Sequence, residues 1–139
     1  MSLSATARFT PRGDLGRFVS ARVTPAVTAS VEAAGALIEQ SAKLYCPVDT
    51  GELQGSITTE IIPTDSSVRS ATAPHTSYAA YVEFGTGQRG AESPGAGDGP
   101  YSPNWPGMVA QPYMRPAVDE TRETIADLFR SQLSLALAS

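Results

Sequence analysis

The sequence contains little of what disulfide-stabilised, thiol-dependent or metal-dependent proteins require. Cys46 is the only cysteine and His75 the only histidine among 139 residues. A single cysteine excludes an intrachain disulfide, which is typical of a protein that folds in a reducing cytoplasm. One cysteine and one histidine leave only carboxylates to complete a zinc site. We therefore predict neither a metal nor another cofactor.

Basic residues and long apolar runs are scarce as well. Ten Lys and Arg stand against 14 Asp and Glu, a net charge of −4, so the chain lacks the overall basic character of a protein held to nucleic acid by phosphate contacts. The longest apolar run, residues 33–38, is too short to cross a bilayer, and residues 1–4 do not resemble a signal peptide. We expect a soluble protein made in the cytoplasm, with no membrane partner.

Catalytic constellations are also missing. Cys46 and His75 have no neighbouring acid in the sequence to orient a nucleophile–base pair, and an inert packing thiol is the ordinary role for a cysteine at the end of a helix. Residues 85–90 match GxGxxG, but the Gly- and Pro-rich residues after them offer no helix N-terminus for a pyrophosphate. Capping, turn formation and ion pairing explain the acids Asp49, Glu52, Glu83, Asp119 and Glu120 better than a hydrolytic carboxylate pair does. We predict no catalytic residue and no enzyme.

Two helices are the clearest positive features. The first is predicted to start at Thr24, with Pro25 in its first turn, and to end before Pro47. Its apolar stripe follows the helical period at Val27, Val31, Ala34, Ile38, Ala42 and Tyr45. Gly35 costs a helix about 1 kcal/mol relative to Ala, which predicts a close contact at that position. Glu39 and Lys43 are spaced as an i,i+4 pair.

The second helix is predicted near Pro116, with Asp119 and Glu120 in its first turn, where acids complement the helix dipole. Its apolar face is formed by Val118, Ile125, Leu128, Phe129, Leu133 and Ala136.

A turn is predicted at Asp49-Thr50-Gly51, where Gly51 can take positive φ. Strand signals follow this turn. Ile57, Thr59 and Ile61 alternate with polar residues, and residues 68–73 are predicted to pair with them across a turn at 63–67. Before the first helix, residues 4–12 show weaker alternation and are compatible with a short strand or an ordered arm, and residues 14–22 have the spacing of a turn or two of helix. These elements predict an α+β fold, with a long N-terminal and a C-terminal helix packed on a small, mostly antiparallel sheet.

We expect one domain, residues 1–139, with residues 1–23 as an arm or short helix. Tyr78, Tyr81 and Val82 predict a helical turn that stops at Gly85. A Gly- and Pro-rich extended loop follows over residues 85–111. Loops of this length are usually functional or disordered.

Three segments in order resemble a known family. They are Pro47-Val-Asp-Thr-Gly-Glu-Leu-Gln-Gly-Ser-Ile57, Tyr78-Ala-Ala-Tyr-Val-Glu-Phe-Gly-Thr86 and Ala110-Gln-Pro-Tyr-Met-Arg-Pro-Ala117. Together they are similar to the HK97 gp10-like family of tailed-phage tail components, also described as neck proteins. The similarity runs from about residue 24 to the end of the chain. The loop between the second and third segments is longer here than the family usually shows.

The resemblance implies a structural virion protein, assembled in the bacterial cytoplasm, that forms a homo-oligomeric ring at the neck or the head-proximal tail. Six-fold symmetry is the first expectation and twelve-fold the second. Expected partners are adjacent head-closure, connector, tail-tube or terminator proteins, with DNA passing through the channel without sequence-specific contact. The alternatives are a tail terminator or tail completion protein, a virion-associated hydrolase, and a monomeric adaptor.

We assign interface or structural roles to ten residues of the second and third segments and the loop. They are Glu83, Phe84, Gly85, Thr86, Tyr101, Trp105, Pro112, Tyr113, Arg115 and Pro116. Glu83 is expected to pair with Arg115, and Tyr101 and Trp105 to anchor residues 88–108 on a neighbour. Arg8, Arg12, Arg17 and Arg22 are equally compatible with a solvated arm and with contact to DNA or an acidic neighbour.

Overall fold

The computed structural model describes residues 3–8, 13–65, 67–86 and 106–138. The elements in chain order are β1 (Leu3–Arg8), α1 (Gly13–Tyr45), α2 (Glu52–Ser56), β2 (Thr58–Pro63), β3 (Ser67–Ala73), α3 (Ala79–Phe84) and α4 (Met114–Ala138). The strands form one antiparallel sheet in the order β1-β3-β2.

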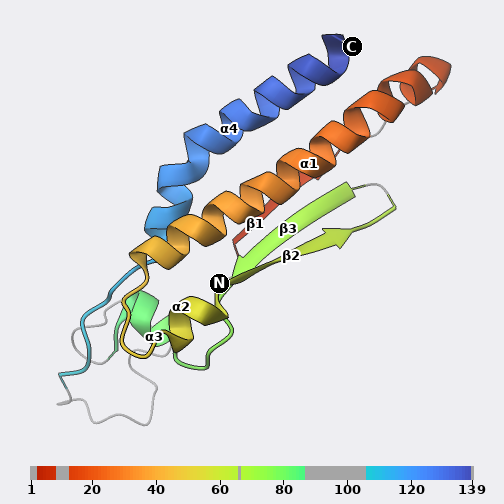
Figure 1. The fold of residues 1–139 in the computed structure, drawn as a ribbon. Coiled ribbons are helices and arrows are strands. Elements are labelled where there is room, and N and C mark those ends of the chain that lie inside the picture. The colour runs from red at the N-terminus through yellow and green to blue at the C-terminus, as the bar shows by residue number, and fades with distance from the viewer. Residues whose placement is uncertain (1–2, 9–12, 66, 87–105, 139) are drawn as a thin grey trace.

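The molecule is layered, with α1 in the middle (Figure 1). One side of α1 packs on the sheet and another packs along α4, which runs antiparallel to it. The N-terminal end of α1, the β2–β3 hairpin and the C-terminal end of α4 lie at one end of the molecule, and α2 and α3 lie at the other. The predicted α+β fold and the hairpin are confirmed, and of the two alternatives for the N-terminal residues the strand is present, as β1.

The first long helix begins earlier than the sequence predicts. Its predicted start at Thr24 is wrong, because α1 begins at Gly13 and runs without interruption through Pro25. Proline lacks the amide hydrogen that would bond to the carbonyl of Ala21. Pro25 and Ala21 are both exposed, so water can bond to that carbonyl. Residues 13–23, expected as an arm or separate short helix, are therefore the first turns of α1.

Gly35 is the point where α1 approaches the sheet most closely. A Cβ at this position would lie 2.5 Å from Cγ2 of Thr59 and 3.1 Å from Cβ of Ser70. The Gly35 carbonyl accepts a hydrogen bond from the Thr59 hydroxyl at 3.1 Å and a longer one from Thr72 at 3.4 Å. The predicted close contact at Gly35 is confirmed, and polar groups supply part of the packing between helix and sheet.

The predicted stripe of α1 is buried along most of its length. Val31, Ala34, Ile38 and Ala42 are buried, whereas Tyr45, the last residue of the helix, is exposed. The Glu39–Lys43 pair is confirmed, with its carboxylate oxygen and ammonium nitrogen 2.6 Å apart.

The second long helix also begins earlier than predicted. Because α4 begins at Met114, Pro116 falls within the first turn, and that turn contains no acid. The expected dipole role of Asp119 and Glu120 is therefore wrong. Glu120 instead accepts a 2.7 Å hydrogen bond from the hydroxyl of Ser41, which joins α4 to α1.

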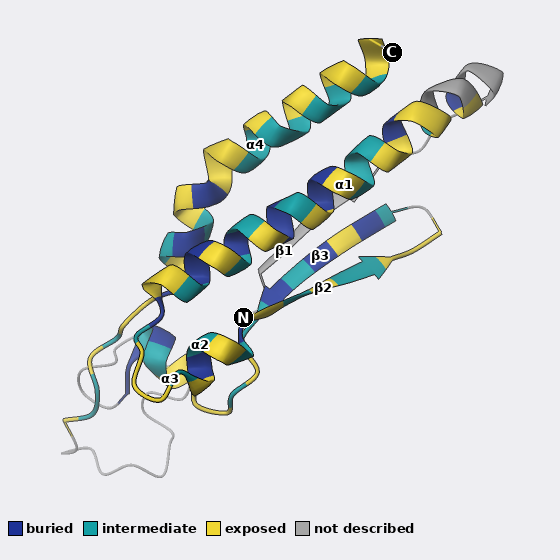
Figure 2. Ribbon diagram, in the orientation of Figure 1, coloured by how far each residue is buried: buried dark blue, intermediate teal, exposed yellow. Residues whose placement is uncertain are grey.

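Burial is uneven along the molecule (Figure 2). The main apolar cluster lies where the end of α1 meets α2, α3 and the start of α4, and includes Cys46, Leu53, Ile57, Tyr113 and Ala117. The predicted apolar face of α4 beyond Thr121 is only half-buried, and Leu135 and Leu137 are 65% and 63% exposed. No helix in the described ranges combines the length and apolarity needed to span a membrane.

Candidate functional site

The three sequence segments that resemble one family meet at the end of the molecule that holds α2 and α3. The first segment leaves α1 and forms α2, the second forms α3, and the third leads into α4. Segments separated by more than 20 residues along the chain thus build one continuous region around the buried apolar cluster.

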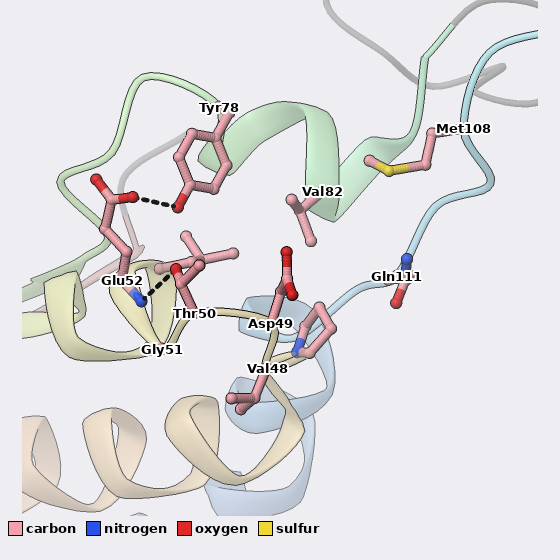
Figure 3. Close-up of a pocket in the computed structure, with 11 residues that line it drawn as sticks. Val48, Asp49, Thr50, Gly51, Glu52, Tyr78, Val82, Met108 and Gln111 are labelled. Carbon is pink, nitrogen blue, oxygen red and sulfur yellow. Dashed lines mark hydrogen bonds between the residues drawn. The ribbon is translucent and has the colours of Figure 1, made fainter.

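The surface of this region contains a hollow of about 540 Å³ (Figure 3). Val48, Asp49 and Glu52 line it on one side and Tyr78 and Val82 on another, with Met108 and Gln111 contributed by the chain that approaches α4. The remaining lining residues are Pro47, Thr50, Gly51 and Leu53. The hollow therefore combines apolar walls with two carboxylates and draws on all three segments.

A short turn fixes the acidic side of the hollow. Gly51 has φ +83°, the left-handed conformation predicted for this position, and it allows the chain to turn directly into α2. The Thr50 hydroxyl accepts a hydrogen bond from the Glu52 amide at 3.3 Å, and the Tyr78 hydroxyl donates to the Glu52 carboxylate at 3.3 Å. Partial burial and the nearby Glu52 charge raise the pKa of Tyr78 above its ordinary value.

Glu83 forms the strongest connection between the second and third segments. Its Oε2 accepts hydrogen bonds from the amides of Tyr113 and Met114 at 2.8 and 2.9 Å, and its Oε1 accepts one from the amide of Arg115 at 3.1 Å. These amides lie at the N-terminus of α4, where a helix leaves donors unsatisfied. The buried carboxylate of α3 therefore caps α4 from a different part of the chain.

The predicted contact between Glu83 and Arg115 is present, although the backbone amides are the closer partners. Nε of Arg115 lies 3.6 Å from Oε1 of Glu83, and the Arg115 side chain is 44% exposed. The guanidinium group also lies 5.3 Å from the centre of the Phe84 ring, which is compatible with a cation–π contact. The Arg115 side chain thus lies over the contact between α3 and α4, while the three backbone amides supply the hydrogen bonds to the Glu83 carboxylate.

Further hydrogen bonds extend this connection in both directions. Thr86 and Met108 exchange two bonds: the Thr86 amide donates to the Met108 carbonyl at 2.9 Å, and the Met108 amide donates to the Thr86 hydroxyl at 3.0 Å. The Gln111 amide donates to the carbonyl of Val82 at 2.8 Å. The two ends of the chain between residues 86 and 108 are therefore held together directly.

Tyr113 is fully buried beneath this connection. Its hydroxyl donates to the carbonyl of Ala79 at 3.2 Å, and burial together with the Glu83 charge raises its pKa well above the ordinary value. The phenol therefore stays neutral and acts as a hydrogen-bond donor inside the core.

The residues assigned from the sequence fall into three groups. Glu83, Gly85, Thr86 and Tyr113 are buried and hold the segments together, and Phe84 and Pro116 are half-buried. Pro112 and Arg115 are exposed on the surface. Tyr101 and Trp105 lie outside the described residues.

Sequence reasoning missed the exposed apolar rim of the hollow. Val48 in the lining is 62% exposed, and Val109, between the lining residues Met108 and Gln111, is 57% exposed. Leu44 and Tyr45, shortly before Val48 in the chain, are exposed as well. The sequence indicates part of this exposed apolar surface, because Leu44 is not in the apolar stripe of α1 and therefore lies on another face of the helix. Val48 and Val109 could not be assigned, because they belong to irregular segments without a period.

The side chains considered for catalysis have other partners. Burial raises the pKa of the Cys46 thiol, whose sulfur lies 3.5 Å from the carbonyl oxygen of Pro47. The His75 ring lies 2.9 Å from the Thr58 hydroxyl. Among the residues that the structure describes, no group of three or more His, Cys, Asp or Glu is arranged to hold a metal ion.

Comparison with family models relates this chain to known proteins. Residues 14–85, just over half of the chain, match the family model described as "Bacteriophage HK97-gp10, putative tail-component". The chain belongs to the HK97-gp10-like family. The match covers α1 through α3 and therefore the first two of the three segments, so the resemblance noted in the sequence is confirmed.

Of the three comparisons, only the one with family models gave a match. Searches against curated proteins and against solved structures found no significant match. The family places this HK97-gp10-like chain among phage tail components, which supports a structural protein associated with the virion.

Proposed function

We propose that this HK97-gp10-like protein is a ring subunit at the neck or the head-proximal tail of the virion. The observation that supports the proposal is the convergence of the three segments on one end, where they form a hollow whose lining includes the exposed side chains of Val48 and Tyr78. Exposed apolar residues gathered around a concave surface favour contact with another protein. A structural role therefore fits this end better than a catalytic one.

The ring is a closed homo-oligomer, with six-fold symmetry preferred and twelve-fold second. Head-to-tail contacts between identical subunits either close into a ring or grow into filaments, and a virion component of defined size requires closure. The partners are head-closure, connector, tail-tube or terminator proteins above and below. The net charge of −4 supports a channel that DNA crosses without sequence-specific contact.

Electron microscopy of purified particles tests the proposal. We expect density for six copies, or twelve, as a ring around the channel near the head–tail junction. Density on the last ring of the tail tube instead would identify the protein as a tail terminator. One or two copies in each particle, or copies outside the channel, would contradict the ring.

A further inference from the structure

The described side chains give the molecule opposite charges at its two ends. The end that holds the N-terminal part of α1 and the β2–β3 hairpin carries exposed Arg17 and Arg69 against Asp65. Arg130 and Asp127, near the end of α4, form a salt bridge of 2.7 Å and balance each other. This basic end also exposes the side chains of Leu135 and Leu137.

The opposite, acidic end contains the hollow. Asp49 and Glu52 are exposed on its lining, and Figure 3 shows the Asp49 carboxylate directed into the hollow. Of the cationic side chains at this end, Lys43 is paired with Glu39 and Arg115 lies beside Glu83. Val48 in the lining, and Val109 between the lining residues Met108 and Gln111, add exposed apolar surface at this end.

We propose that the hollow binds the basic end of a second copy of this chain, so that each subunit joins the next through its two opposite ends. The inference rests on the proposed ring and names its interface. Charge and apolarity both match: Asp49 and Glu52 face arginines, while Val48 and Val109 cover the leucines of α4. Opposite potentials steer association and select the partner, and buried apolar side chains supply affinity.

The two surfaces differ within one subunit, so the contact is heterologous and can be repeated around a ring. The long helices α1 and α4 connect the two ends directly, which fixes the angle between successive contacts. The geometry of a single subunit then determines how many copies close the ring.

A charge exchange tests which surfaces meet. One variant carries Asp49→Lys and Glu52→Lys, and a second carries Arg17→Glu and Arg69→Glu. Each variant alone would bring like charges together, so we expect incorporation into particles to fall at least about tenfold. Mixed in equal amounts, the two variants should assemble as alternating copies, because every contact then pairs opposite charges. A chain that carries all four substitutions should also assemble by itself.

Cross-linking provides a second test that does not depend on charge. Val109→Cys combined with Leu135→Cys, oxidised in assembled particles, should give a ladder of covalent multimers up to the full ring. The matched control combines Leu135→Cys with Ala36→Cys, which is exposed in the middle of α1 and should give no ladder. Leu135→Cys alone should also remain uncross-linked, because a disulfide requires Cα atoms within about 7 Å of each other.

The outcomes separate this inference from the proposed function. A ring in the particle that tolerates both charge variants, or a control ladder equal to the test ladder, overturns the interface and leaves the ring intact. Absence of any ring overturns both. Thermal melting of each soluble variant, unchanged to within a few degrees, shows that lost assembly reflects the contact and not the fold.

Discussion

Several individual residues join segments that are distant along the chain through polar contacts. Glu83 receives three backbone amides from the start of α4, and Gly35 presents its carbonyl to two threonine hydroxyls of the sheet. Hydrogen bonds to a charged acceptor contribute about 1.5–3 kcal/mol, more than neutral ones. The carboxylate of Glu83, which accepts three such bonds, therefore contributes strongly to the stability of the fold.

Replacing Glu83 should destabilise the protein much more than replacing Arg115. Glu83→Gln removes the charge and leaves amides without a full set of acceptors, so the free energy of unfolding should fall by about 3 kcal/mol. Arg115→Met should cost under about 1 kcal/mol, because its charged group is partly solvated. Urea denaturation of both single variants and the double variant measures these values and their coupling.

The control is Glu123→Gln on the exposed surface of α4, which should change stability by less than about 0.5 kcal/mol. Equal losses for Glu83→Gln and Arg115→Met would show that the ion pair, and not the amide cap, is the principal contact.

Gly35 should reject even one added carbon. Gly35→Ala would place Cβ 2.5 Å from Cγ2 of Thr59, and the resulting shift should cost about 1–3 kcal/mol despite the better helix propensity of Ala. Thr59→Ser removes that methyl group and keeps the hydroxyl, so it should rescue part of the loss in the double variant. Differential scanning calorimetry provides the measurement.

Gly55 is the matched control for this prediction. A Cβ added there meets nothing within 4 Å, so Gly55→Ala should be neutral or slightly stabilising. If Gly35→Ala were equally harmless, the helix and sheet would not be in tight contact at this point.

At the scale of elements, α1 is the component that organises the fold, because it separates the sheet from α4 and contacts both. Pro25 lies inside this helix, where proline costs up to about 3 kcal/mol relative to alanine. Pro25→Ala should therefore stabilise the protein and raise its melting temperature. Amide hydrogen exchange should show greater protection at residues 24–26. If α1 really began at Thr24, the substitution would have little effect, since proline is tolerated in a first turn.

The elements also show which parts of the fold the sequence could predict. Periodicity located both long helices and the hairpin, and Gly35 and Gly51 were correctly assigned to a close contact and a tight turn. Both helix starts were misplaced, because Thr24-Pro25 and Pro116 are good start signals locally. At Pro116 the true start at Met114 is favoured by the Glu83 cap, which comes from 30 residues away and leaves no local pattern.

The hollow was less predictable than the fold. The family match covers the first two of the three segments that the resemblance selected, and all three meet at one end of the molecule. Glu83–Arg115 was the one long-range contact inferred from residue types. The rim residues Val48 and Val109 could not be recognised, because their exposure depends on how three separate segments meet.

At the scale of the whole molecule, folding and assembly are predicted to depend on different parts of the chain. Replacing residues 88–105 with a short Gly/Ser linker should leave the melting temperature nearly unchanged, because Thr86 and Met108 hold the two ends together. The same replacement should block joining of heads and tails if Tyr101 and Trp105 anchor a neighbour. Trp105→Ala alone should weaken assembly by about 2 kcal/mol or more.

The replaced range ends at residue 105, and not at residue 108 as the sequence suggests, because Met108 lines the hollow and bonds to Thr86. Calorimetry and infectivity of complemented particles provide the two measurements. A replaced chain that does not fold would place the segment in the core, and infectious particles built from it would remove its assembly role.

The closure between Thr86 and Met108 also has an evolutionary consequence. Once the two ends are held by the protein itself, doubling the length of the intervening chain costs only about 0.6 kcal/mol of closure entropy. Insertions, deletions and substitutions there are then nearly neutral for folding and are exposed to selection mainly through what they bind. Related phages should therefore diverge fastest in this segment, and exchange of the segment between them should transfer partner preference without redesign of the scaffold.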